Sequence, residues 1–201
     1  MTDAGATELV RERLGEGQAL VAAMLGSEPC VAQIAAAAET IGAAAARGNK
    51  LLLFGNGGSA ADAVHVAAEF VGRYLTERRP LPALALAANI SALTAIGNDY
   101  GFEEIFARQV TALGSPGDVA VGLTTSGRSP NVAKGLDAAR AAGLETIAMT
   151  GEDPGPVGAS AELTIAIPST ETPRIQEGHM LAAHTICEWV EDLIAGQEPQ
   201  A

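Results

Sequence analysis

The sequence predicts an α/β fold in three layers, with a mostly parallel sheet flanked by helices on both faces. Short apolar segments of strand length, such as 51–54 and 119–123, alternate along the chain with longer helix-forming segments. Each of these two segments runs into a turn rich in glycine or hydroxyl residues, and a helix follows. Two more helical segments precede the first strand, and 201 residues suffice for a single domain, 1–201, with a full-sized core.

Residues 1–48 are predicted to form two N-terminal helices. Apolar residues recur at roughly helical spacing over Thr7–Leu25. Ser27 can cap a second helix with Pro29 in its first turn, and Gly48 ends that helix. A minimal α/β unit does not need two such helices. They therefore either pack against another subunit or cover the sheet.

The rest of the chain alternates strands with helices. The predicted strands are 51–54, 83–87, 119–123, 146–149 and 163–167. The predicted helical segments are a motif helix running to about Tyr74, a helical turn at 91–96, and helices 102–113, 131–142 and 172–194, with a loop at 97–101 and a frayed tail at 196–201. Ligands of such sheets bind beyond the carboxyl ends of the strands. We therefore expect the two polar turns, which begin at 55 and 124, to meet on one ligand.

The composition narrows the classes of function. A formal net charge of −12 argues against a nucleic-acid surface, which needs clustered Lys and Arg. Aromatic residues make up only 3%, so the core must be built from Ala, Leu, Val and Ile. Cys30 and Cys187 lie in apolar segments and are expected to be buried free thiols. We find no signal-peptide pattern and no unbroken apolar run of about eighteen residues, so we expect a cytoplasmic protein without a membrane span.

The stretch Phe54–Glu69 joins the first strand to the motif helix. Its glycine-rich turn permits a tight bend and close approach of the backbone to a ligand. The first N–H groups of the helix and the positive end of its dipole suit an anion. Glu69 follows His65 by four positions, so both share one face of the helix. This pair is either part of a site or an exposed ion pair.

Three kinds of site fit such a turn. Gly55, Gly57 and Ala60 match the dinucleotide-binding pattern G-x-G-x-x-A, but the acidic residue that this pattern requires is supplied only by Glu77, in loop-like sequence. A P-loop is excluded, because no Gly-Lys-Ser/Thr follows. A sugar-phosphate site remains as the third interpretation, and the rest of the chain supports it.

The second turn, 124–131, has the same setting as the first. It follows a buried strand and opens a helix. Thr125, Ser126 and Ser129 can donate hydrogen bonds to phosphate oxygens, as can the first amides of the helix. This turn therefore favours the sugar-phosphate interpretation.

The chain contains three histidines, His65, His179 and His184. His179 and His184 are five residues apart, which places them about 140° apart around a helix. If one faces the site, the other faces elsewhere. We expect His184 to be functional and His179 to be a structural or surface residue.

Four separated motifs, in this order, resemble those of the phosphoheptose isomerase family. They are Gly55-Asn56-Gly57-Gly58-Ser59-Ala60-Ala61-Asp62 followed by His65 and Glu69, then Asn98-Asp99, then Thr125-Ser126-Gly127 with Ser129, and finally Arg174-Ile175-Gln176-Glu177 with His184. The resemblance covers nearly all of the chain from Gly55 to Val190. Members of this family have the SIS fold, which is flavodoxin- or Rossmann-like. They interconvert sedoheptulose 7-phosphate and D-glycero-D-manno-heptose 7-phosphate, a step of bacterial heptose biosynthesis.

The resemblance implies roles for individual residues. The substrate or its phosphate would be contacted by Asn56, Gly57, Gly58, Ser59, Glu69, Asn98, Asp99, Thr124, Thr125, Ser126, Ser129 and Gln176. One zinc ion per subunit would be held by His65, Glu69, Gln176 and His184. Glu69 and His184 would carry the proton transfers, and the protein would be a homotetramer. Arg128 departs from the family pattern, which has a small polar residue there. It either faces solvent or alters substrate binding.

These residue types suit an isomerisation through an enediol. Such a reaction needs a base at carbon and an acid near oxygen, which a carboxylate beside an imidazole supplies near neutral pH. A metal ion could polarise the carbonyl, although an amide such as that of Gln176 is a weak zinc ligand.

Gln176 and His184 are eight residues apart, about 12 Å along a straight helix. Their side chains lean together, or the helix begins after Gln176, or the two come from different subunits. We predict that each site is built at a subunit interface.

Two other functions remain open at this point. A non-catalytic SIS protein that binds a sugar phosphate or a replication initiator protein would be expected to lack the set of two histidines, Glu and Gln, and here all four are present. An isomerase of a different ketose phosphate would keep these residues and change only the sugar.

Overall fold

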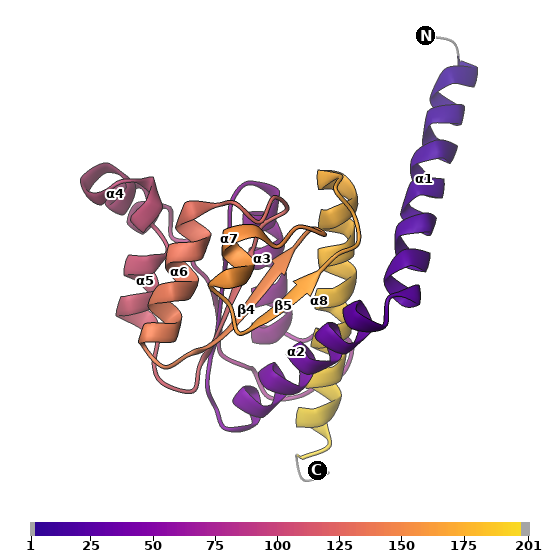
Figure 1. Cartoon of the computed structure of the whole chain (residues 1–201). Helices are drawn as coiled ribbons and strands as arrows, with labels where there is room; N and C mark the ends of the chain where they lie inside the picture. Colours follow the sequence, from indigo (N-terminus) through magenta and orange to yellow (C-terminus); the bar gives the residue numbers. More distant parts are fainter. Residues whose placement is uncertain (1–2, 198–201) are drawn as a thin grey trace.

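The computed structural model describes residues 3–197, which form a parallel sheet with helices on both faces (Figure 1). The five strands lie in the order β2-β1-β3-β4-β5, and all neighbours pair in parallel. They are β1 (Leu51–Gly55), β2 (Ala83–Ala85), β3 (Val119–Leu123), β4 (Glu145–Thr150) and β5 (Leu163–Ala166). The predicted three-layer α/β fold is confirmed.

The helices are α1 (Asp3–Gly26), α2 (Glu28–Ala46), α3 (Gly58–Val71), α4 (Ile90–Tyr100), α5 (Ala107–Leu113), α6 (Pro130–Ala141), α7 (Gly155–Ala159) and α8 (Thr172–Ala195), with a 3-10 helix η1 (Phe102–Glu104). Helices α2, α3 and α8 cover one face of the sheet, and α5 and α6 cover the other. The short helix α7 was not predicted. Of the predicted frayed tail, residues 198–201 lie outside the described residues.

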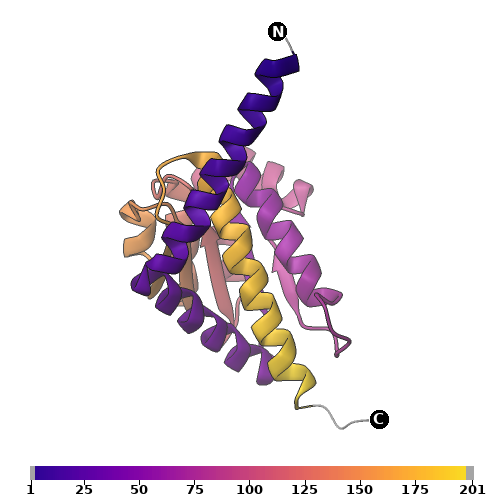
Figure 2. The ribbon, with the colours of Figure 1, turned by 90° about the vertical axis from the view of Figure 1, so that its right-hand side faces the viewer.

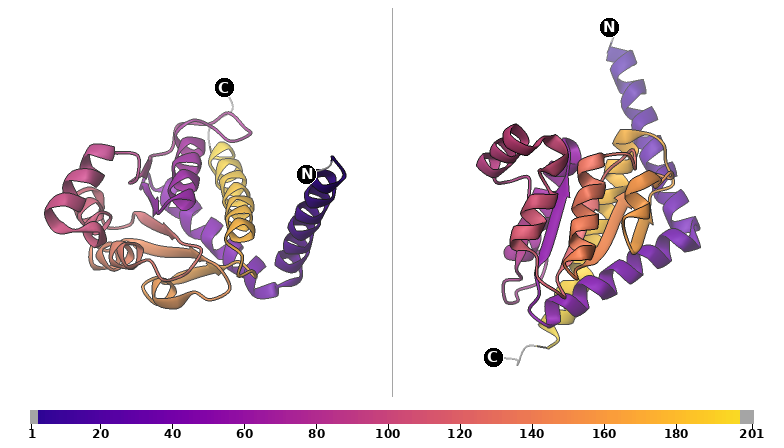
Figure 3. Two further views of the ribbon diagram at one scale, coloured as in Figure 1. Left: turned by 90° about the horizontal axis from the view of Figure 1, so that it is seen from above. Right: turned by 60° about the vertical axis from the view of Figure 1, so that its left-hand side comes forward.

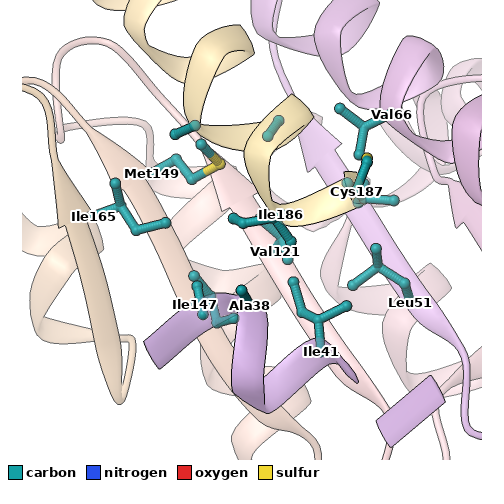
Figure 4. Packing of buried hydrophobic residues seen from close by; sticks show 14 of the residues in the cluster. Ala38, Ile41, Leu51, Val66, Val121, Ile147, Met149, Ile165, Ile186 and Cys187 are labelled. Carbon is teal, nitrogen blue, oxygen red and sulfur yellow. The ribbon is translucent and has the colours of Figure 1, made fainter. Parts of the chain in front are cut away.

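Alternate residues of each strand supply the two halves of the core. Leu51 and Leu53 of β1 point towards α2, α3 and α8, whereas Leu52 and Phe54 point towards α5 and α6. Figure 4 shows the first of these clusters, in which Ile41 and other aliphatic side chains from helices and strands interdigitate. Because both faces are covered, the central strands β1 and β3 are apolar throughout, which explains why they are recognisable as continuous apolar runs.

The two N-terminal helices differ in how they are packed. Ser27 accepts a hydrogen bond from the N–H of Cys30 and caps α2, as expected. By length and composition α2 could also cross a membrane, but core helices of soluble proteins pass the same test, and α2 packs against α8 and β5. Helix α1 extends well beyond the rest of the fold (Figures 1 and 2). It leaves Leu14 and Leu25 exposed.

The loop predicted at 97–101 is wrong, because α4 continues to Tyr100. The side chain of Asn89 caps the start of this helix by accepting from the N–H of Ala92 at 3.1 Å. Gly101, with a φ of 96°, then ends it. The helix predicted over 102–113 is divided into η1 and α5.

The motif helix α3 ends at Val71, three residues earlier than predicted. The backbone N–H groups of Tyr74, Leu75 and Thr76 all donate to the carboxylate of Glu191 on α8. These N–H groups are therefore drawn away from the carbonyls that would have continued the helix. The backbone leaves helical geometry at Gly72, and Glu191, 117 residues after Tyr74, holds the segment that follows.

His179 is fully buried and ties α8 to the end of β4. Its Nε2 atom lies 3.1 Å from the carbonyl oxygen of Thr150. Burial lowers the pKa of His179 to about 4, although the bond to Thr150 opposes this shift. The expectation that His179 is structural agrees with this position.

We expect the free energy of unfolding to fall by about 2 kcal/mol between pH 7 and pH 5 through His179 alone. Its folded pKa lies below the unfolded value of about 6.5, so the unfolded chain binds the proton first. The contribution is complete above that unfolded value and is lost as the pH falls towards 4. Urea denaturation of the wild type and of His179→Gln at several pH values checks this. The variant is less stable at pH 7 but should show a shallower decline, and equal declines would contradict the assignment.

Candidate active site

The polar turns after β1 and β3 lie side by side at the carboxyl edge of the sheet. The two strands are direct neighbours, and Gly55 pairs with Leu123 at their ends. The side-chain amides of Asn56 and Asn131 then exchange two hydrogen bonds of 2.9 and 2.8 Å across the gap. The structure therefore brings the two turns together, as the sequence predicted.

The first turn leaves the N-terminus of α3 open. Gly57 has a φ of 57°, and among the described residues no side chain caps the helix. A Cβ atom at Gly58 would lie 2.1 Å from Nε2 of Gln176, so a larger residue at position 58 would displace that amide. Ser59, the next residue of α3, is buried. N–H groups at an uncapped helix start suit an anionic group.

The second turn presents hydroxyl groups at the N-terminus of α6. Thr124 Oγ1 lies 3.0 Å from Ser129 Oγ and 3.4 Å from Ser126 Oγ. Ser129 precedes the first residue of α6 without capping it through its side chain. Thr125 lies in the same turn and is partly buried. Two helix N-termini and a cluster of hydroxyls thus lie at one edge of the sheet.

Arg128 faces solvent and pairs with an acidic neighbour. Its Nη2 atom lies 2.6 Å from Asp153 Oδ2, and both side chains are exposed. The guanidinium charge beside the second turn is therefore largely offset. An exposed arginine was one of the two alternatives that the sequence left open.

His65 and Glu69 of α3 meet His184 of α8. His65 Nε2 lies 3.1 Å from Glu69 Oε1 and 3.3 Å from His184 Nε2. One ligand atom from each of the three residues lies within 4.8 Å of the others. Two imidazole nitrogens this close either share a proton or direct both lone pairs at a cation.

The spacing of this cluster fits a zinc ion. With metal–ligand distances of 2.0–2.2 Å, the ligand atoms of a tetrahedral site lie about 3.4 Å apart, close to the observed separations. Two imidazoles and one carboxylate are also a frequent donor set of zinc enzymes, which leave the fourth position to water or substrate.

Gln176 lies at the first turn rather than at this cluster. Helix α8 begins at Thr172, so Gln176 and His184 belong to one continuous helix. The amide of Gln176 covers Gly58, about two turns of helix before His184. The alternative in which the helix starts after Gln176 is therefore wrong. Within one chain, Gln176 is placed to contact a ligand of the turn.

Asn98 and Asp99 lie apart from the other predicted site residues. Both are exposed on α4, where Asn98 Nδ2 donates to Asp99 Oδ1 at 2.8 Å. Helix α4 packs mainly on η1 and projects away from α3 and α8 (Figures 1 and 3). The structure does not bring these two residues to the turns of the same chain.

Sequence reasoning missed three residues of the site region. Asn131 holds the two turns together, and the ring of Tyr74 stacks on His184 with centroids 5.2 Å apart. Burial raises the pKa of Asp62, and the charge of His65 lowers it in part. Asp62 stands in the first motif, and Asn131 ends the second turn. Both follow a strand closely, and this position could have marked them as residues of the site. Nothing local to Tyr74 indicates its partner.

Both cysteines are buried free thiols, which confirms the prediction. Cys187 lies on α8 near the cluster. Burial, followed by the negative charge of Glu69, raises its pKa to about 12. A thiol that stays protonated is a poor nucleophile.

Comparison with known proteins gives concordant matches. The profile of the SIS domain family matches residues 19–151. The phosphoheptose isomerase of Aquifex aeolicus is 58% identical over 162 residues, which are 81% of this chain and 85% of that protein. The phosphoheptose isomerase of Burkholderia pseudomallei is 46% identical over 189 residues, which are 94% of this chain and 96% of that protein.

A solved phosphoheptose isomerase from Neisseria gonorrhoeae superimposes with a TM-score of 0.84 at 41% identity, covering 93% of this chain and 99% of that one. The match therefore extends over nearly the whole chain. The chain belongs to the phosphoheptose isomerase family of SIS-domain proteins.

Proposed function

We propose that this protein is an aldose–ketose isomerase that interconverts sedoheptulose 7-phosphate and D-glycero-D-manno-heptose 7-phosphate in bacterial heptose biosynthesis. The observation that carries the proposal is the placement of two sites on one helix. The phosphate-type turn opens α3 at Gly58, and the cluster begins seven residues later at His65.

The distance between these two sites suits the substrate. Seven residues of helix rise about 10 Å. A seven-carbon sugar with a terminal phosphate, built from bonds of about 1.5 Å, spans a similar length when extended. A phosphate held at the turns would therefore place the carbonyl end of the sugar beside Glu69 and His184.

We assign phosphate binding to neutral donors. These are the amides and side chains of the two turns, at Asn56, Gly57, Gly58, Ser59, Thr124, Thr125, Ser126 and Ser129, with Gln176 covering the first turn. Two helix dipoles add partial positive charge at the same edge. This explains how a chain with a net charge of −12 holds an anionic substrate.

Glu69 and His184 are the proton carriers in this proposal. Glu69 directs one carboxylate oxygen at His65, which leaves the other to take a proton from the carbon next to the carbonyl. His184 Nε2 is placed to give or accept a proton at the neighbouring oxygen. One zinc ion per subunit, held by His65, Glu69 and His184, would polarise the carbonyl when bound. Because Nε2 of His184 cannot hold a metal and a proton together, it serves one role at a time.

We infer that the protein assembles as a homotetramer of single SIS domains, 1–201, with sites at subunit interfaces. Helix α1 exposes apolar side chains, and a groove of about 470 Å³ between α1, α2 and α8 is lined by residues that include Val21, Leu25, Ile34 and Trp189. A projecting α4 suits the same assembly, because Asn98 and Asp99 would then reach the turns of a neighbour. We also infer a cytoplasmic location, since buried free thiols suit a reducing compartment.

The first test is turnover of sedoheptulose 7-phosphate by the purified protein. We expect Glu69→Gln and His184→Gln each to lower kcat by about 10²–10⁴-fold, because each removes a group that moves a proton. Glu77→Gln, the same change at a nearly fully exposed glutamate, should leave kcat unchanged. A folded oligomer without turnover would instead indicate a binding protein or an isomerase of another sugar.

A second test concerns the metal. Zinc titration by calorimetry of chelator-treated protein should show one site per subunit. His65→Gln should weaken it strongly, since one of two imidazole ligands is lost. In Gln176→Ala, unchanged affinity would leave Gln176 as a substrate contact, and weakened affinity would add it to the ligands. Tight binding that survives His65→Gln would refute the cluster as the site.

The third test concerns assembly. A charge on the apolar face of α1, in the double variant Leu14→Glu and Leu25→Glu, should dissociate the tetramer, because carboxylates would be buried without partners. Glu12→Arg reverses a charge on the opposite side of the same helix, about 140–160° around from the two leucines, and should not. Sedimentation velocity measures the masses, and an intact tetramer in the double variant would show that α1 is not the interface.

A further inference from the structure

Tyr74 is an aromatic neighbour of His184, in addition to His65. The Tyr74 and His184 rings are stacked, with centroids 5.2 Å apart and planes inclined by 27°. The ring of His65 lies at the same centroid distance, inclined by 56°. Tyr74 is partly buried and also packs on the core cluster beneath α8. The imidazole of His184 therefore contacts two rings, one of which, Tyr74, itself packs on the core.

The backbone that carries Tyr74 is anchored by Glu191. This carboxylate lies on α8, two turns after His184 and on the same face. It accepts from the N–H of Tyr74 at 2.7 Å, from that of Leu75 at 2.6 Å and from that of Thr76. Glu191 as a whole residue is only 1% exposed. Helix α8 thus holds both His184 and the segment that covers it.

Arg78 holds the other side of the same segment. Its Nε atom lies 3.5 Å from Glu191 Oε2, and both side chains are 2% exposed. The guanidinium donates to the carbonyls of Phe70 and Gly72, each at 2.9 Å, and to that of Glu69 at 2.7 Å. One buried ion pair therefore fixes the segment after α3 and the main chain of Glu69. Its many hydrogen bonds offset the cost of burying two charges.

We propose that Tyr74 is a positioning residue for His184, and that the buried pair of Glu191 and Arg78 fixes Tyr74 in place. The proposal rests on the function assigned above to His184. His184 is only partly buried, so its imidazole has more than one accessible rotamer. Stacking on Tyr74 selects the rotamer in which Nε2 faces His65, and a small displacement of such a group lowers the rate of turnover steeply.

The test replaces the ring and its neighbour separately. Tyr74→Leu removes the stacking surface, and Tyr74→Phe keeps it while removing the hydroxyl. Leu75→Ala truncates the adjacent, exposed side chain of the same segment and serves as the control. We expect kcat to fall roughly 10- to 100-fold in Tyr74→Leu with KM unchanged, and to stay near the wild-type value in the other two.

A second readout does not depend on turnover. With only three histidines, ring carbon–proton NMR signals of metal-free protein can be assigned by comparison with His184→Gln and His65→Gln. The nuclear Overhauser contact between the ring protons of His184 and His65, whose Nε2 atoms lie 3.3 Å apart, should weaken in Tyr74→Leu and persist in Leu75→Ala. It should also persist in Tyr74→Phe. Tyr74→Met fills similar space without a ring and replaces Tyr74→Leu if the latter does not unfold cooperatively.

An Overhauser contact between His184 and His65 that persists in the ring-less variants would overturn the proposal, as would an unchanged kcat. If the wild type does not turn over the heptose phosphate, the proposed function fails. The NMR comparison then still decides whether Tyr74 positions His184.

Discussion

The close parallel packing of α3 against α8 is the constraint on which the rest of the site depends. Small buried residues, among them Ala63 and Ala182, line these two helices. Three contacts follow along the seam in the same order on both helices, namely Gly58 with Gln176, His65 with His184, and the segment after α3 with Glu191. A shift of either helix along its axis would disturb all three contacts at once.

Sequence reasoning succeeded where the signal was local. Apolar runs that end in glycine or hydroxyl turns revealed the strands, and the rules for parallel sheets then placed the two turns together. The spacing of His65 and Glu69 gave their shared face, but their meeting with His184 depends on the register of two helices far apart in the sequence. The loop expected at 97–101 had the composition of a turn, yet the cap at Asn89 and the stop at Gly101 decided the helix. No local pattern predicts that Glu191 binds the backbone of Tyr74, because the two residues are more than a hundred positions apart.

The electrostatic design of the site relies on geometry more than on net charge. Arg128, the cation in the second turn, is committed to Asp153, so an anion there meets hydroxyls, amides and helix ends. Such donors discriminate by position, since each must point at an oxygen of the ligand. The buried charges nearby are those of Arg78 and Glu191, which pair with each other and anchor Tyr74 away from the turns.

The amide bridge between Asn56 and Asn131 has an evolutionary consequence. The turns that we propose to bind the phosphate follow directly on two central strands and are bonded to each other, so their loss would be expected to disturb the sheet. The cluster that we propose to carry protons consists of three side chains on two helices, with His65 half exposed. A descendant of this chain could therefore abandon chemistry by a few substitutions and still capture the same sugar phosphate, so that an enzyme scaffold of this kind is a short mutational distance from a metabolite sensor.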